Sequence, residues 1–365
     1  MPGTNESEMR SEAGNSHEGD AQARSMADTV ARRSYGKLVA FLAARTRDVA
    51  AAAEHGEIPD RRLALLFACA HPAIDAGVRA PLMLQVVVGL DAKTIASAFL
   101  TSPAAMGKRL GRAKDKLRHG GIPFSVPERE ELSSRLDSVL EAIYAAFAEG
   151  WSDPGAADVV RDLTSEAMFL ARVVTELLPD EPEALGLLAF LLHAEARRRA
   201  RRNANGEYVP LAEQDSALWD WEMIGEAEAV IRRASALGAI GRYQLEAAPQ
   251  SAHVYRGRTG HANWADVAQL YDALFALTSL PVVALNRALA IAELHGAAAG
   301  LDAMPDPKAD ARLSEYQPHW AARAELLAKT GANDDARHAY EIAIGLERDP
   351  AVRLFLQQRQ AVLAP

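Results

Sequence analysis

Apolar residues recur along most of this chain at intervals of three and four positions, which is the spacing of one face of an amphipathic helix. The stretches "YGKLVAFLAARTRDVAAAAE" (35–54) and "RRLALLFACAHPAI" (61–74) both show this pattern. From Leu132 onward the pattern continues, interrupted only by short runs rich in glycine, proline and aspartate. These breaks fall at residues 153–155, 178–182, 203–210, 257–263, 278–281 and 304–310. No segment alternates as a strand would, so we predict an all-α fold.

Residues 89–118, "GLDAKTIASAFLTSPAAMGKRLGRAKDKLR", predict two short helices joined by a tight turn. Asp91 is the expected N-cap of the first helix. Ser102 followed by Pro103 is typical of a cap with proline at the first helical position, so the second helix begins there. The first helix is expected to turn four apolar residues inward: Leu90, Ile95, Ala96 and Phe99.

The second of these helices, predicted over about 103–117, has two distinct faces. Its apolar stripe consists of Met106, Leu110, Ala113 and Leu117. The other side begins with small residues, which let a helix approach base edges, and continues with long cations that reach phosphates. The candidate DNA-binding residues are Thr101, Ser102, Ala104, Ala105, Lys108, Arg109, Arg112, Lys116 and Arg118. The pattern predicts a helix-turn-helix; the alternative is an ordinary amphipathic hairpin with a solvated basic face.

Composition restricts how such an element can bind DNA. The 365 residues carry a formal net charge of −9, so any contact with nucleic acid must come from a local basic patch. The single cysteine, Cys69, excludes an internal disulfide and fits a reducing cytoplasm. No run approaches the roughly 18–20 apolar residues of a membrane span, and no signal peptide opens the chain. We therefore expect a cytoplasmic protein with no membrane partner.

The last third of the chain shows signs of a repeat. The stretch "HWAARAELLAKTGANDDARHAYEIAIGLERDP" resembles a tetratricopeptide repeat (TPR), with Trp320, Ala336, Tyr340 and Ala343 at the expected spacing. Residues 264–294 supply another helix pair of similar length. Such pairs stack into a solenoid whose concave face binds a protein or peptide ligand; the alternative is a scaffold that only packs against the preceding domain.

The stretch 89–118 resembles region 4 of bacterial RNA polymerase sigma factors of the extracytoplasmic-function (ECF, sigma-70) class. Flanking motifs in the same order, such as "LLPDEPEALGLLAFLLHAEARRRAR" and "GRYQLEAA", resemble the subgroup with a long helical, TPR-like C-terminal extension. The resemblance runs from about Ile58 to the C-terminus. It implies a transcription regulator in which residues 102–112 read the promoter −35 element and the later cations contact phosphates. It further implies binding of core RNA polymerase through region 4 and a regulatory role for the extension.

The chain departs from this family ahead of region 4. Residues 28–57 resemble only a remnant, the first helix, of sigma region 2, and the middle of that region has no counterpart. We therefore expect −10 recognition and DNA melting, which region 2 performs, to be absent or to depend on a partner. The predicted divisions are a disordered leader (1–27), the region 2 remnant (28–57), region 4 (58–118), a linker (119–130) and an α-helical C-terminal domain (131–365), TPR-like from about 264.

Motifs for catalysis are absent from the sequence. It contains no His-Glu-x-x-His, no Gly-Lys-Ser/Thr phosphate loop and no Gly-x-Ser-x-Gly elbow, so we expect no enzyme activity, metal or cofactor. The run "RRRARR" (197–202) is either a nucleic-acid or polymerase contact or a solvated helix end. The expected partners are promoter DNA, core RNA polymerase and a protein or peptide ligand of the solenoid. Two other hypotheses stay open: a helical protein-interaction module with a vestigial helix-turn-helix, and an enzyme with an unrecognised pocket between helical layers.

Overall fold

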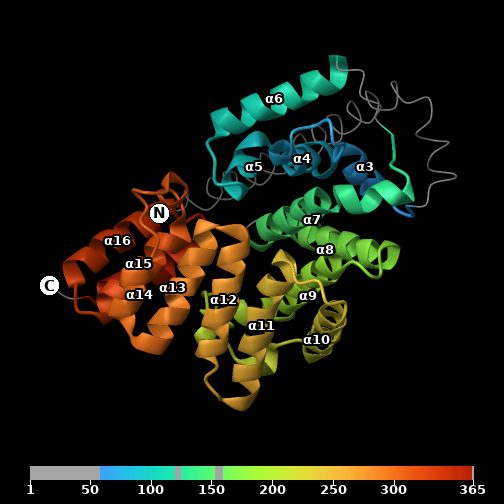
Figure 1. Cartoon of the computed structure of the whole chain (residues 1–365). Coiled ribbons are helices and arrows are strands. Elements are labelled where there is room, and N and C mark those ends of the chain that lie inside the picture. The colour runs from blue at the N-terminus through green and yellow to red at the C-terminus, as the bar shows by residue number, and fades with distance from the viewer. Residues whose placement is uncertain (1–57, 120–124, 153–158, 364–365) are drawn as a thin grey trace, which may run out of the picture. The chain divides into compact units, whose positions relative to one another are not determined.

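The computed structural model describes residues 58–119, 125–152 and 159–363. The predicted leader and the region 2 remnant lie outside these residues. Within them the chain forms α-helices α3 to α17 and no strand, so the predicted all-α fold is confirmed (Figure 1). The nearest approach to a sheet is an isolated antiparallel bridge between Arg202 and Tyr208. None of the described helices is both long enough and apolar enough to cross a membrane.

Many of the helices follow one another with short connections, whereas residues 197–220 form a long connection between α9 and α10. Their bounds are α3 Arg61–Cys69, α4 Ala76–Met83, α5 Ala92–Ala98, α6 Pro103–His119, α7 Arg129–Ser152, α8 Val159–Leu177, α9 Pro182–Ala196, α10 Trp221–Ala236, α11 Arg242–Thr259, α12 Trp264–Thr278, α13 Pro281–His295, α14 Ala297–Ala303, α15 Gln317–Lys329, α16 Asn333–Leu346 and α17 Pro350–Ala361.

The chain divides into two compact units. Among the described residues, the first unit contains 58–95, 107–119 and 125–139, and the second contains 96–106, 140–152 and 159–363. The division passes through α5, α6 and α7, so these helices contribute to both units.

In the first unit, the start of α7 is held against the end of α3 by a buried arginine. Arg135 is 3% exposed, and its Nη1 donates to the carbonyl oxygen of Phe67 at 3.3 Å. Its Nη2 donates to Glu131 on the same helix at 3.1 Å. A cation near the last carbonyls of a helix is also favourably placed for the helix dipole. Arg135 therefore ties the end of α3 to the first turns of α7 with one side chain.

The helix α4 continues into a last turn of a different kind. After α4, residues Leu84–Val88 form a turn of π-helix, and Gly89 ends it with a φ of 88°. This left-handed conformation is one that glycine adopts at little cost.

In the second unit, α9 is enclosed by other helices. It packs against α8, α10 and α11. Its buried residues point in every direction around the helix axis: Ala184, Leu185, Gly186, Leu187, Leu188, Ala189, Leu191, Leu192, His193, Ala194 and Ala196. A helix that is apolar all round has to be covered on all sides.

The contact between α9 and α11 depends on a glycine. A Cβ at Gly186 would lie 2.5 Å from the backbone nitrogen of Gln244, so only a hydrogen fits there. One turn earlier, the Glu183 carboxylate accepts hydrogen bonds from the backbone N–H groups of Tyr243 and Gln244 at 2.8 and 3.2 Å. These groups lie in the first turn of α11 and have no intrahelical acceptor. Glu183 thus caps α11 where the two backbones meet.

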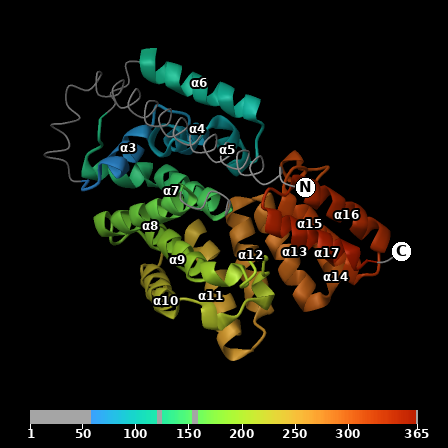
Figure 2. The ribbon, with the colours of Figure 1, turned by 180° about the vertical axis from the view of Figure 1, so that it is seen from behind.

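The last helices pair as the repeat pattern predicts. α12 packs on α13, and α15 packs on α16 across a three-residue turn containing Gly331 (Figure 2). The core of the second pair contains Ala336, Tyr340 and Ala343, with Trp320 packed against it. α17 adds Leu356 to the same core.

Replacing Gly186 by alanine tests the close approach of α9 and α11. We expect Gly186→Ala to lower the free energy of unfolding by about 1–3 kcal/mol, since the added methyl group forces the backbones apart. Gly225→Ala is the matched control, because it lies within α10 with open space around its Cβ position. It should be neutral or stabilise by up to about 1 kcal/mol. Urea denaturation of both variants measures the difference, and equal stabilities would contradict the interpretation.

Candidate nucleic-acid interface

The first helix of the predicted helix-turn-helix is capped as expected. Asp91 Oδ1 accepts hydrogen bonds from the backbone N–H groups of Lys93 and Thr94 at 2.9 and 2.8 Å. The bond from Thr94 is the main reason that the pKa of Asp91 lies below its ordinary value. Ile95 and Ala96 are fully buried, whereas Leu90 and Phe99, which were expected to face inward, are only half-buried.

The turn between α5 and α6 is tight and locally strained. Leu100 has a φ of 48°, a conformation that is uncommon for a residue other than glycine. The backbone N–H of Thr101 donates to the carbonyl oxygen of Ala96 at 2.9 Å and closes the turn. Ser102 Oγ then accepts from the backbone N–H of Ala105 at 3.2 Å, and Pro103 is the first residue of α6. The predicted cap and proline position are confirmed.

The predicted apolar stripe of α6 is buried. Met106, Leu110 and Ala113 are 0%, 2% and 6% exposed, and Leu117 is half-buried.

The candidate DNA-binding residues differ in exposure. Ser102, Ala104, Lys108, Arg112 and Lys116 are exposed, whereas Thr101, Ala105 and Arg109 are half-buried. Arg118 belongs to α6, but its side chain lies outside the described part of the structure.

Three of these cations share one face of α6. Lys108, Arg112 and Lys116 are spaced four residues apart, so they lie one above another along the helix. Within the described part of the chain, none of the three side chains has a hydrogen-bond or ion-pair partner. Three exposed, unpaired cations on one helical face form a surface suited to a polyanion.

Arg109, also predicted to contact DNA, has a partner within the protein. Its Nη2 donates to the carbonyl oxygen of Gly77 at 3.1 Å, in the first turn of α4. A Cβ at residue 77 would lie 2.8 Å from this nitrogen, so the glycine makes room for the guanidinium. Arg109 therefore holds α6 to α4. The 32 residues that separate the pair leave no local pattern by which the sequence could reveal it.

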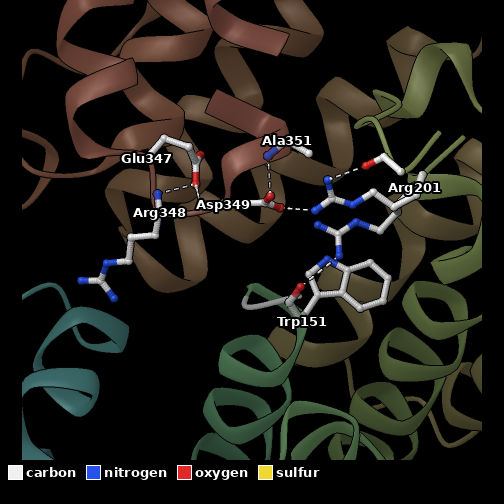
Figure 3. Close-up of polar contacts among 8 residues, drawn as sticks. Trp151, Arg201, Glu347, Arg348, Asp349 and Ala351 are labelled. Atoms are coloured by element: carbon white, nitrogen blue, oxygen red, sulfur yellow. Dashed lines mark hydrogen bonds and ion pairs between the residues drawn. The ribbon is translucent and has the colours of Figure 1, made fainter. Parts of the chain in front are cut away.

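Four of the five arginines in the run 197–202 bond to other groups of the protein, and Arg199 is exposed. Arg201 stacks over the Trp151 ring at 4.3 Å and donates to the Trp151 carbonyl oxygen at 2.9 Å (Figure 3). Arg202 forms an ion pair with Asp349, the N-cap of α17. Arg198 binds Glu195 at 2.7 Å. These arginines tie the end of α7 and the start of α17 to the segment after α9.

Two histidines of the second unit, His193 and His253, are held in the neutral state. His193 is fully buried in α9, with its Nε2 3.4 Å from Glu228 Oε1. Burial, and then the nearby Arg197, lower the pKa of His193 to about 4. Burial, Arg256 and Arg197 lower the pKa of His253 to about 3. No cluster of three or more metal-ligating side chains occurs among the described residues.

Comparison with known proteins places the chain in a family. An uncharacterized protein of Rhizobium meliloti (strain 1021) is 38% identical over 329 residues, which cover 90% of this chain and 77% of that protein. The chain belongs to the family of that protein. Residues 135–235, from early α7 to late α10, also match a family of unknown function (DUF6596). No solved structure matches the chain.

The neutral state of His193 predicts a loss of stability in acid. In the unfolded chain the imidazole of His193 takes up a proton below about pH 6.5, whereas in the folded chain it stays unprotonated down to about pH 4. Its contribution to stability is therefore present above pH 6.5 and is lost as the pH falls through this window. Between pH 7.5 and pH 5 the free energy of unfolding should fall by roughly 2 kcal/mol because of His193.

His193→Gln should remove that part of the pH dependence, while His295→Gln, at an exposed position of α13, should retain it. Urea denaturation followed by tryptophan fluorescence measures the effect, because all five tryptophans lie in the second unit. The same pH dependence in the wild type and in His193→Gln would exclude this role for the histidine.

Proposed function

We propose that this protein is a non-enzymatic transcription regulator, similar to ECF sigma factors, that binds promoter −35 DNA through α6. The face formed by Lys108, Arg112 and Lys116 is the observation that supports this proposal most directly. The same region 4 segment contacts core RNA polymerase in this proposal, and the helices from α7 onward regulate the contact. Promoter melting falls to a partner, since the middle of region 2 has no counterpart in the chain.

The electrostatics favour local rather than general attraction to DNA. The chain as a whole is acidic at −9, so DNA is repelled except where cations are grouped. On α6 the buried stripe fixes which side of the helix is covered, and the three free cations lie elsewhere on its surface. A helix held in this way presents its cations without first ordering them, which reduces the entropic cost of binding.

The position of Arg109 divides the predicted contacts into two groups. Lys108, Arg112 and Lys116 are available to phosphates or base edges. Arg109, bound to Gly77, acts in this proposal by orienting α6 rather than by touching DNA.

Substituting the free cations tests the proposed DNA interface. We expect Lys108→Ala and Arg112→Ala each to weaken binding to duplex DNA and to reduce the slope of log affinity against log salt by about 1, because each removes about one phosphate contact. Fluorescence anisotropy with labelled duplexes, enriched from a random pool by the wild-type chain, measures affinity and slope together.

Lys308→Ala is the control for this experiment, because Lys308 is an exposed lysine in the connection after α14. It should leave the affinity and the slope unchanged. Unchanged slopes in both α6 variants would contradict the proposed interface.

Co-elution of the full chain with core RNA polymerase tests the second half of the proposal. A shortened chain without the later helices can be compared with the full chain. It should extend beyond Val139, because the first unit runs to that residue and needs Arg135 on α7, which bonds to Phe67 on α3. Binding to polymerase supports a sigma-like role. Absence of both polymerase and DNA binding would favour the second candidate, a helical protein-interaction module with a vestigial helix-turn-helix. The paired helices α12–α13 and α15–α16 support that candidate.

A further inference from the structure

A small hollow lies between the segment after α9 and the last helix, entirely within the second unit. Its volume is about 240 Å³. One wall comes from residues 203–213 and the other from α17. The lining residues are Asn203, Glu207, Tyr208, Val209, Glu213, Ala351, Leu354, Phe355 and Gln358.

Both walls of the hollow are held in place by contacts between them. Arg202 bonds to Asp349, the cap of α17, so the start of one wall is tied to the start of the other (Figure 3). The Tyr208 and Phe355 rings meet edge to face at 5.4 Å.

The segment itself is closed by a second set of bonds. Asn203 Oδ1 accepts from the backbone N–H groups of Asn205 and Glu207 at 2.9 and 3.0 Å. The antiparallel bridge between Arg202 and Tyr208 adds a backbone pairing. The hollow is therefore preformed, and a ligand would not have to organise it.

The lining combines apolar side chains with two carboxylates. Val209, Leu354 and Phe355 are apolar, and Leu354 stays 45% exposed although it is large. Glu207 and Glu213 are both exposed. Asn203 Nδ2 donates to Glu207 at 2.7 Å, whereas the described residues place no partner on the Glu213 carboxylate. An apolar surface beside unneutralised carboxylates is complementary to a side chain with an apolar stem and a cationic head.

We propose that this hollow binds the lysine or arginine side chain of an extended segment in another protein. The alkyl stem packs on Leu354, Val209 and the Phe355 ring, and the cationic head reaches Glu213 and Glu207. This inference concerns a different surface from α6 and does not depend on the proposed DNA binding.

Size and charge favour this occupant over others. Pockets that enclose small molecules have volumes of about 300–1,000 Å³, so the hollow is better matched to one side chain than to a whole ligand. Several lining residues, among them Glu213, Leu354 and Gln358, are exposed, so the remainder of a partner chain can pass across the opening. The two carboxylates repel phosphate and acidic segments.

Selection from a library of random peptides displayed on phage, with the full-length chain as the target, tests the proposal. We expect the enriched peptides to share a lysine or arginine beside an apolar residue. A fluorescein-labelled peptide carrying the enriched sequence is then titrated by anisotropy.

The double variant Glu207→Gln/Glu213→Gln should bind this peptide about tenfold more weakly. Leu354→Ala, which removes the apolar contact, should also weaken it several-fold. Glu222→Gln/Glu315→Gln, the same exchange at two exposed sites outside the hollow, should bind as the wild type does. All the exchanged glutamates are exposed, so the variants should unfold at the same thermal midpoint as the wild type. This match would exclude unfolding as the cause of weaker binding.

Enrichment of peptides without a shared basic position would overturn the proposal, as would equal affinity for the wild type and the Glu207→Gln/Glu213→Gln variant. Full displacement of the labelled peptide by millimolar Nα-acetyl-lysine methylamide would assign the hollow to a free organic cation and would overturn the protein partner. Enrichment of lysine or arginine peptides, with affinity lost in Glu207→Gln/Glu213→Gln and in Leu354→Ala but kept in Glu222→Gln/Glu315→Gln, would establish the site.

Discussion

The enclosure of α9 is the constraint on which the second unit depends. A helix that is apolar around its whole circumference cannot face water, so α8, α10 and α11 have to cover it. The closest of these contacts requires that residue 186 has no side chain, and it lets Glu183 cap α11 directly. The same enclosure removes His193 from water and keeps its imidazole neutral. The packing of α9 thus determines its close backbone contact with α11, the cap of α11 and the pKa of His193.

Arginine has different roles in the two units because its partners differ. In the first unit Arg135 and Arg109 donate to backbone carbonyls near helix ends, which aligns one helix with the next. In the second unit Arg201 stacks on Trp151, and Arg202 reaches the cap of α17. Arginines that bond within the protein are not available to a ligand. Lys108, Arg112 and Lys116 on α6 have no such partner among the described residues and stay available. The charge available for binding is thus much smaller than the count of basic residues suggests.

The two proposed binding surfaces are opposite in charge and rest on separate residues. The α6 face is basic and exposed, and its binding energy would come from displaced counterions, so it should weaken steeply with salt. The hollow beside α17 is lined by two carboxylates together with apolar side chains. Burial of an alkyl stem would supply part of its binding energy, which salt affects little. A regulator with these two surfaces could bind DNA and a basic protein segment independently.

Local sequence patterns determined the helices, their caps and the buried stripe of α6. The Asp91 and Ser102 caps, the start at Pro103, and the burial of Met106 and Leu110 all follow from interactions within a few residues. The TPR-like spacing likewise brought Ala336, Tyr340 and Ala343 into one core. Tertiary structure alone gave Arg109 on α6 its partner, because Gly77 meets this arginine across 32 residues. It also decided which partners the arginines of the run 197–202 meet. Arg202 bonds to Asp349 across 147 residues, and this bond ties together the two segments that line the hollow beside α17. Charge and spacing fix what a side chain can do, but only the folded chain determines which partner it meets.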